Sequence, residues 1–208
     1  MSFDYLATYQ KLLSIAKAGQ YYGHDAFDQE RYQSLEQLAL ELISQVGHEP
    51  VDSLRLFTQQ EQGYPTPKVD VRALILKEQQ ILLVQDRKTS TWSLPGGYSD
   101  IGLSPKENIA KEVLEETGLR LSDATLLAVF DTLKRKDIPQ LFQYYKLVFF
   151  CTVEESPLPF TENLETSAIG YFSLSHLPAL SKERTTYEQL HLLMELALAK
   201  TLPFAYCD

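Results

Sequence analysis

The sequence is poor in cysteine, in long apolar runs and in positive charge, and each shortage excludes a class of protein. Its two cysteines, Cys151 and Cys207, lack the CxxC spacing of zinc and redox motifs, so we expect a buried strand thiol and a tail thiol. No run reaches the roughly 18 apolar residues of a membrane helix. The first ten residues show no basic segment followed by an apolar core, as a secretory signal would. We therefore expect a cytoplasmic protein that has no membrane partner.

The acidic balance of the chain argues against nucleic acid as a partner. The net charge is −9 over 208 residues, which disfavours non-specific attraction to DNA or RNA. The apolar fraction of 44% is ordinary for a globular protein with a sizeable core. An anionic substrate would need a metal ion or a local group of basic residues to be held.

The first 63 residues predict a small helical domain. Apolar residues recur at helical spacing over residues 4–18 and 28–46, and Asp28 is placed to cap the second helix. Residues 61–68, EQGYPTPK, are rich in turn formers and predict a linker. The part has four basic residues against nine acidic ones, which is not typical of a DNA-binding head.

Residues 64–208 predict a second domain in which strands and helices alternate. VDVRALILKEQQILLVQDR predicts two strands, near 69–76 and 80–86, joined by a polar turn. ATLLAVFDTLKR, LFQYYKLVFFCTVEE and AIGYFSLSHLP predict further strands, and ERTTYEQLHLLMELALAK predicts a closing amphipathic helix. Strands and helices in this mixed order favour an α/β or α+β sandwich.

The most informative stretch is LPGGYSDIGLSPKENIAKEVLEETGL, which runs from Leu94 to Leu119. Ser104, Pro105 and Glu107 have the positions of an N-cap, a first helical residue and the second half of a capping box. Gly118 has the position of a glycine that ends a helix. The stretch therefore predicts a helix over residues 105–117.

Three glutamates fall on one side of this helix. At about 100° per residue, Glu112, Glu115 and Glu116 span an arc of roughly 100°. Like charges three and four residues apart repel, and a divalent cation between them would relieve that repulsion. Oxygen donors favour Mg²⁺ or Mn²⁺ over zinc, and the turn at Gly96 and Gly97 can bring a backbone carbonyl close to the helix. The alternative is a solvated acidic face. The adjoining arc is predicted to be apolar: Ile109, Ala110, Val113, Leu114.

These residues together resemble the Nudix box, G-x5-E-x7-R-E-U-x-E-E-x-G-U, in which U is aliphatic. Gly97 opens the match, and the segment 111–119, KEVLEETGL, closes it. The resemblance implies an α/β/α sandwich built on a mixed sheet. It also implies a Mg²⁺ cofactor, for which Mn²⁺ could substitute, held by Glu112 and Glu116 with help from Glu115 and the Gly97 carbonyl.

The sequence departs from this box at two positions. Leu103 stands where the box has its first glutamate, and Lys111 stands where it has arginine. In the family that glutamate often pairs with the arginine or contacts metal through water, which leucine cannot do. Lys111 keeps the positive charge but loses the bidentate fork. A degraded box is therefore an alternative to a working one, and we expect the changes to alter a supporting contact.

The N-terminal segment Gly19–Leu42 is similar to the helical domain that precedes a bacterial Nudix subgroup, and Glu183–Leu190 also fits that subgroup. Its members cleave nucleoside diphosphates linked to another group, such as CDP-choline or ADP-ribose. The resemblance implies a pyrophosphatase that releases a nucleoside monophosphate and a phosphorylated X, and a homodimer formed through the helical domain. The alternative is a catalytically weak sensor that binds a nucleotide-sugar.

Residues outside the metal cluster are expected to complete the site. A general base could come from Glu162 or Glu165, because both precede a strand in a loop expected near the site. Lys111 would act beside the glutamates, and Tyr98 is placed to stack on a base. Basic residues near the box are candidates for holding substrate phosphates: Arg72, Arg87, Lys134, Lys136.

Overall fold

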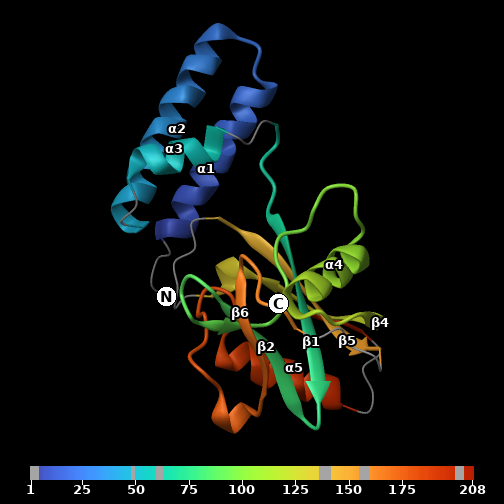
Figure 1. Cartoon of the computed structure of the whole chain (residues 1–208). Helices are drawn as coiled ribbons and strands as arrows, with labels where there is room; N and C mark the ends of the chain where they lie inside the picture. Colours follow the sequence, from blue (N-terminus) through green and yellow to red (C-terminus); the bar gives the residue numbers. More distant parts are fainter. Residues whose placement is uncertain (1–4, 48–49, 60–62, 136–141, 155–159, 200–203) are drawn as a thin grey trace. The chain divides into compact units, whose positions relative to one another are not determined.

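A computed structural model describes residues 5–47, 50–59, 63–135, 142–154, 160–199 and 204–208. The chain forms two compact units, drawn in Figure 1. The helical unit consists of Met1–Pro67 with Arg135–Gln143, and the sheet unit consists of Lys68–Lys134 with Tyr144–Asp208. The sequence placed the division after residue 63 and did not predict that residues 135–143 group with the first unit.

The helical unit contains α1 (Tyr5–Tyr22), α2 (Ala26–Gly47) and α3 (Val51–Gln59). The sequence predicted the first two and missed α3, which is only nine residues long. Its Leu54 is nevertheless buried, and it joins a small apolar core. The residues of that core come from all three helices: Leu6, Leu40, Ile43, Leu54.

The start of α2 corrects one prediction. Asp28 does not cap this helix, because α2 begins two residues earlier, at Ala26. The capping carboxylate is that of Asp25, whose Oδ1 accepts hydrogen bonds from the Phe27 and Asp28 backbone N–H groups at 3.0 and 3.1 Å. Asp28 instead forms an exposed ion pair with Arg31, in which Arg31 Nη1 lies 2.7 Å from Asp28 Oδ1.

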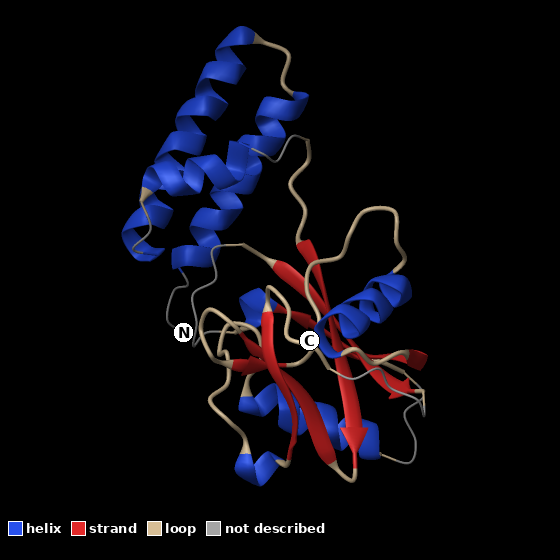
Figure 2. Cartoon of the chain, viewed as in Figure 1, coloured by secondary structure: helices blue, strands red, loops and turns tan. Residues whose placement is uncertain are grey.

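The described strands of the sheet unit form one mixed, seven-stranded sheet, shown in red in Figure 2. The order is β3-β2-β1-β5-β4-β7, with β6 pairing on β2. β1 runs parallel to β5 and antiparallel to β2, and β4 runs antiparallel to β5. The strand bounds are β1 Lys68–Lys77, β2 Gln80–Asp86, β3 Trp92–Ser93, β4 Leu121–Asp131, β5 Tyr144–Val153, β6 Thr166–Phe172, β7 Tyr206–Cys207.

Two long helices cover opposite faces of this sheet. Alternate residues of a strand face opposite sides, and β1 divides accordingly. Val71, Ala73 and Ile75 pack with α4 (Pro105–Thr117), whereas Leu74 packs in a second cluster with α5 (Tyr187–Leu198). The α/β/α sandwich implied by the sequence is therefore confirmed. Two short 3₁₀ helices, η1 (Thr132–Lys134) and η2 (Leu174–His176), lie in the connections.

α4 has the bounds that its caps predicted. Ser104 accepts the Glu107 backbone N–H, the Glu107 carboxylate accepts the Ser104 N–H, and Gly118 ends the helix at φ 74°. Ile109 and Val113 are fully buried against the sheet. Leu114 was predicted to belong to this apolar arc, but it is 36% exposed, because the buried arc is narrower than the sequence suggested.

The two cysteines differ in their burial and lie in different strands. Cys151 is a buried thiol on β5, as expected, and Cys207 is exposed. The tail residue Cys207 lies in β7, which pairs with β4 and was not predicted. No described helix is long and apolar enough to cross a membrane.

Candidate active site

A glycine turn holds the site against β1. The backbone N–H groups of Val71 and Ala73 donate to the carbonyls of Gly97 and Pro95, both at 2.9 Å. Gly96 has φ 132°, and a Cβ there would overlap the Val71 carbonyl. At Gly97 a Cβ would lie 3.1–3.2 Å from the Glu112 carboxylate. The two glycines therefore let the turn pass tightly between β1 and the acidic face of α4.

Glu116 is the most deeply placed acid of this face. Its side chain is 9% exposed, and its Oε2 accepts the Gly96 backbone N–H at 2.7 Å. Burial raises the pKa of Glu116 to about 7, although the Gly96 hydrogen bond and the positive charge of Arg72 act the other way. Burial also raises the pKa of Glu112, and the charges of Glu115 and Glu165 add to that rise. Positive charge delivered to this pair would stabilise both carboxylates.

These residues fit a hard divalent cation. In the part of the chain that the structure describes, no three His, Cys, Asp or Glu side chains form a complete metal cage. Glu112 and Glu116 nevertheless place carboxylate oxygens beside the Gly96–Gly97 turn. Mg²⁺ often takes only one or two carboxylates with water and substrate phosphates. The Gly97 carbonyl accepts the Val71 N–H and keeps a second lone pair, so its role as a ligand stays a prediction.

Lys111 and Glu115 are engaged with each other on the exposed edge of α4. Lys111 Nζ lies 3.0 Å from Glu115 Oε2 and 3.2 Å from Asp100 Oδ2. Hydrogen bonds to Glu115 and Asp100 raise the pKa of Lys111 well above its usual range. Glu115 therefore orients Lys111 in this structure. Asp100 supplies a second carboxylate, the kind of partner that the box glutamate would have given.

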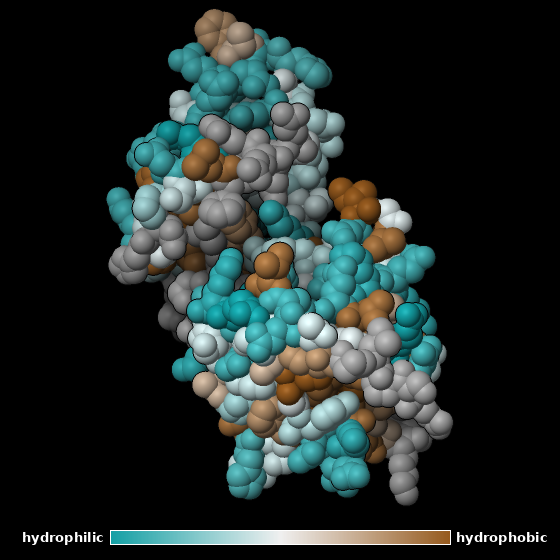
Figure 3. Space-filling view, viewed as in Figure 1, coloured by the Kyte–Doolittle hydropathy of each residue, from teal (hydrophilic) through white to brown (hydrophobic). Residues whose placement is uncertain are grey.

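Leu103 lies on the loop that leads from Asp100 into α4. Figure 3 shows hydrophobic side chains at the tip of this loop, where Ile101 is fully exposed and Leu103 is 39% exposed. The side chain of Asn108, a buried residue of α4, holds this loop. Asn108 Oδ1 accepts the Asp100 N–H at 2.8 Å, and its Nδ2 donates to the Asp100 and Leu103 carbonyls. Asn108 thus holds Asp100 beside Lys111.

The candidate bases lie on the loop before β6. Glu165 is exposed, and its negative charge contributes to the raised pKa of Glu112. Asn163 holds this loop: its Oδ1 accepts the Glu165 N–H at 2.9 Å, and its Nδ2 donates to the Glu115 carbonyl at 2.8 Å. Glu162 is paired with Arg87 instead, Oε2 to Nη2 at 2.7 Å. The geometry favours Glu165 over Glu162 as the base.

The predicted substrate-binding cations differ in placement. Arg72 is 5% exposed and forms a two-pronged pair with Asp70, at 2.7 and 3.0 Å, while its Nη1 donates to the Leu94 carbonyl. Its buried positive charge stabilises the ionised glutamates, since it acts to lower the pKa of both Glu112 and Glu116. Arg72 therefore suits a supporting role better than direct contact with substrate.

The remaining predicted residues divide between the turn and the periphery. Tyr98 follows the turn, is 62% exposed and stacks on Tyr144, with ring centroids 5.6 Å apart and 21° between planes. Lys134 is exposed at the end of η1, and among the described residues it forms no ion pair with Glu112 or Glu116. Lys136 lies outside the described residues. The role of Tyr98 as a surface for stacking a base stays a prediction.

Comparison with known proteins identifies the family to which this chain belongs. The NUDIX domain model matches residues 66–193, more than half of the chain. The chain belongs to the Nudix family. This confirms the resemblance noted in the sequence, and with it the class of enzyme, a Nudix pyrophosphatase.

The relatives extend the similarity to the helical unit. A model described as a UDP-X-like, N-terminal oligomerisation domain matches residues 4–57. The putative ADP-ribose pyrophosphatase YjhB of Bacillus subtilis (strain 168) is 39% identical over 186 residues, 89% of this chain and 88% of the relative. The crystal structure of a UDP-X diphosphatase is 36% identical, with TM-score 0.64, and covers 99% of this chain and 98% of that one. An ADP-ribose pyrophosphatase from Streptococcus suis 89-1591 is 38% identical over 69% of this chain and 100% of its own, with TM-score 0.61.

The Asp100–Lys111 pair makes the departure at Leu103 testable. Asp100→Asn is expected to lower kcat/KM about fivefold, because an exposed ion pair contributes about 1 kcal/mol at most. Leu103→Glu is expected to change it less than threefold, since Lys111 already has two carboxylate partners. Both are measured by steady-state hydrolysis on the best substrate. A hundredfold gain for Leu103→Glu would mean that the leucine marks an impaired site.

Proposed function

We propose that this protein hydrolyses the pyrophosphate bond of a nucleoside diphosphate linked to another group, with Mg²⁺ or Mn²⁺ as cofactor. The products would be a nucleoside monophosphate and a phosphorylated X. The observation that carries the proposal is the pair Glu112 and Glu116, which meet the Gly96–Gly97 turn, Glu116 buried and Glu112 half-buried, with raised pKa values. Two crowded carboxylates beside a glycine turn are suited to hold a cation that a pyrophosphate also needs.

Each residue of the pair has a defined task in this proposal. Glu116 is oriented by the Gly96 N–H, and Glu112 is confined by the close passage of Gly97. A bound Mg²⁺ would supply positive charge for the phosphate oxygens and lower the pKa of the attacking water. Glu165 lies on the loop that Asn163 joins to α4 at Glu115, and it remains exposed to solvent, so it would take the proton from that water.

The substrate is proposed as a class rather than as one compound. The relatives reported above are named for ADP-ribose and for UDP-linked substrates. CDP-choline remains a further member of the same chemical class, because the stacking surface of Tyr98 does not select one base. The test is a panel of ADP-ribose, UDP-sugars and CDP-choline, each assayed with Mg²⁺ and with Mn²⁺ for monophosphate release. Absence of release from every compound would contradict the proposal.

A nucleotide-sugar sensor is the second candidate, and Leu103 is the observation that favours it. A sensor would bind a substrate analogue that cannot be cleaved but release no product from any member of the panel. The Asp100–Lys111 pair weighs against it, since it restores a contact that Leu103 removes. Calorimetric binding of a methylene-bridged analogue, measured beside the hydrolysis panel, separates the two functions.

We further propose that the helical unit joins two copies of the chain into a homodimer. The matching family model is described as an oligomerisation domain. Large apolar side chains are exposed on this unit, among them Leu38 at 57% and Leu56 at 65%. Apolar side chains exposed in this way favour burial against a partner.

Leu38→Asp is expected to convert the dimer to monomer, because a charge would be buried without a partner at the contact. The matched control is Gln33→Asp, which adds the same charge on an exposed position about 140° around α2. Sedimentation velocity on the full-length variants gives the mass of each. A dimer that persists in Leu38→Asp at the same concentration would place the interface elsewhere.

A further inference from the structure

Arg184 lies on the segment that connects β6 to α5. Backbone hydrogen bonds hold this segment in place. Its N–H donates to the Ser181 carbonyl at 2.9 Å, and the Ser181 N–H donates to the Trp92 carbonyl at 2.8 Å. Trp92 belongs to β3, which leads directly into the Gly96–Gly97 turn. The segment that carries Arg184 is therefore tied to the strand that positions the active-site turn.

Two further bonds hold Arg184 from the sheet side. Lys146, a buried residue of β5, donates from Nζ to the Arg184 carbonyl. The neighbouring Thr185 accepts the Leu94 N–H on its Oγ1 at 3.2 Å. Leu94 also accepts a hydrogen bond from Arg72, so the same residue touches the support of the acidic pair. These bonds fix the backbone from which the Arg184 side chain extends.

The guanidinium of Arg184 is held on one side and open on the other. Nη1 lies 3.0 Å from Asp86 Oδ2, while the side chain remains 46% exposed. Asp86 is itself fixed, because its Oδ1 accepts the Lys88 and Thr89 N–H groups. Within the described residues, the other donors of Arg184 contact no carboxylate. A guanidinium oriented by one acid and open to solvent can still bind a phosphate oxygen.

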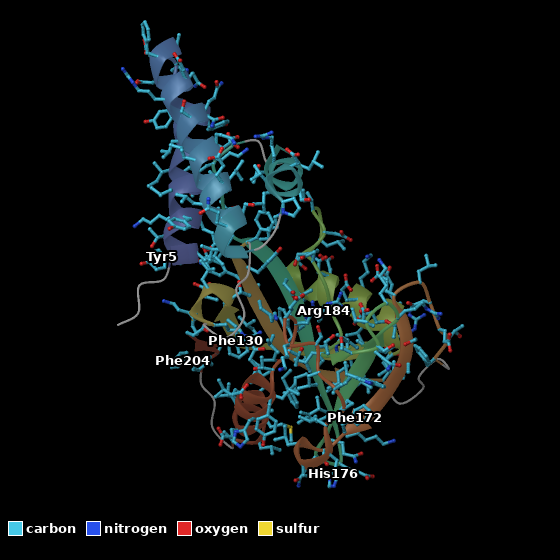
Figure 4. The ribbon with its side chains drawn as sticks, turned by 90° about the vertical axis from the view of Figure 1, so that its left-hand side faces the viewer. Tyr5, Phe130, Phe172, His176, Arg184 and Phe204 are labelled. Atoms are coloured by element: carbon cyan, nitrogen blue, oxygen red, sulfur yellow. The ribbon has the colours of Figure 1, made fainter. Side chains whose placement is uncertain are left out.

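The other cations around the acidic pair are less free. Arg72 is buried and bonded to Asp70 and Leu94, and Lys111 is divided between Asp100 and Glu115. The residue after Arg184, Thr185, is hydrogen-bonded to Leu94, which lies two residues before Gly96, the residue that donates to Glu116. In Figure 4 the labelled Arg184 lies near the middle of the sheet unit, whereas the labelled His176 lies at the lower edge of that unit in this view.

We propose that Arg184 is a substrate-binding residue that pairs with an oxygen of the substrate's diphosphate, and that Asp86 orients it for that contact. The inference rests on the proposed function, since it assigns the anionic group of the same substrate. It also assigns to this task a cation that the sequence analysis did not identify. A guanidinium suits this task because it is planar and can give two parallel hydrogen bonds to a phosphate.

The test compares Arg184→Gln, Arg184→Lys and Asp86→Asn in the full-length protein. Arg184→Gln is expected to lower kcat/KM about a hundredfold and to weaken binding of the methylene-bridged analogue of ADP-ribose by a similar factor. Arg184→Lys should recover part of both losses, since it keeps the charge. The matched control is Arg120→Gln, an exposed arginine beyond the end of α4, which is expected to stay within twofold of wild type.

Asp86→Asn separates substrate binding from a merely structural ion pair. If Arg184 only stabilises Asp86, the two variants would lose activity and thermal stability equally. The proposal expects Asp86→Asn to keep analogue binding within about tenfold, because the guanidinium is still present. The proposal is overturned if Arg184→Gln stays within threefold of wild type in both measurements, or if Asp86→Asn matches its losses.

The analogue makes the two proposals distinguishable. A wild-type protein that binds the analogue but hydrolyses nothing in the panel would contradict the proposed function, and the binding constants of the variants would still decide the role of Arg184. A wild-type protein that binds no analogue, with or without Mg²⁺, overturns both.

Discussion

Replacing Glu116 by glutamine is expected to lower kcat/KM by at least about a thousandfold, which corresponds to roughly 4 kcal/mol of lost transition-state stabilisation. Glutamine keeps the shape of the side chain but removes the negative charge that would bind the cation. Since burial already disfavours the charged form of Glu116, the same change is expected to leave the free energy of unfolding equal or higher. The measurement is steady-state hydrolysis across a Mg²⁺ titration, together with urea unfolding.

Glu154→Gln is the matched control, because it removes one charge from an exposed position at the end of β5. It is expected to leave kcat/KM within twofold. If Glu116→Gln retained the wild-type activity at every Mg²⁺ concentration, Glu116 would not be a metal ligand. The assignment of the acidic face of α4 would then be wrong.

Replacing Gly96 by alanine is expected to destabilise the protein by more than about 3 kcal/mol, because strained backbone and steric overlap add. Gly96 has φ 132°, and the new Cβ would overlap the carbonyl of Val71 on β1. Neither β1 nor the turn can move away without breaking the hydrogen bonds that join them. The unfolding midpoint in urea and the residual activity both report the loss.

Gly102→Ala is the comparison for that variant. Gly102 also has a positive φ, 95°, but a Cβ there meets nothing within 4 Å. Its substitution should therefore cost only the backbone strain, of order 1 kcal/mol. If the two alanine variants were equally stable, the close approach of the turn to β1 would not hold the site.

The local parts of the site could be predicted from the sequence because the signals were local. A capping box and a terminal glycine fixed both ends of α4. The spacing of Glu112 and Glu116 placed both acids on the face that meets the Gly96–Gly97 turn. The apolar run near residues 69–76 predicted a strand, and β1 is found over Lys68–Lys77.

The rest of the site depends on contacts between distant segments. The Asn163 side chain joins the Glu165 loop to α4, and Lys146 fixes the Arg184 carbonyl from another strand. No periodicity along the chain encodes such contacts. Arg72 illustrates the same limit. Its positive charge near the box suggested a residue that binds substrate phosphate, but its burial and its pairing with Asp70 suit it to support the glutamates instead.

The helical unit shows a second kind of limit. α3 is short, and its core contribution comes mainly from Leu54, so a periodic pattern had little to act on. β7 contains two residues and is defined by its pairing with β4 rather than by propensity. Short elements of this kind owe their structure to tertiary contacts, which single-sequence patterns do not carry.

The most direct test of this account is the release of nucleoside monophosphate from the substrate panel by wild-type protein, first stripped of metal with EDTA and then titrated with Mg²⁺. The account predicts no release without metal, saturable release as Mg²⁺ is added to at least one nucleoside diphosphate linked to X, and no recovery in Glu116→Gln. Hydrolysis that proceeds equally in the stripped protein, or no hydrolysis at any Mg²⁺ or Mn²⁺ concentration, would contradict it.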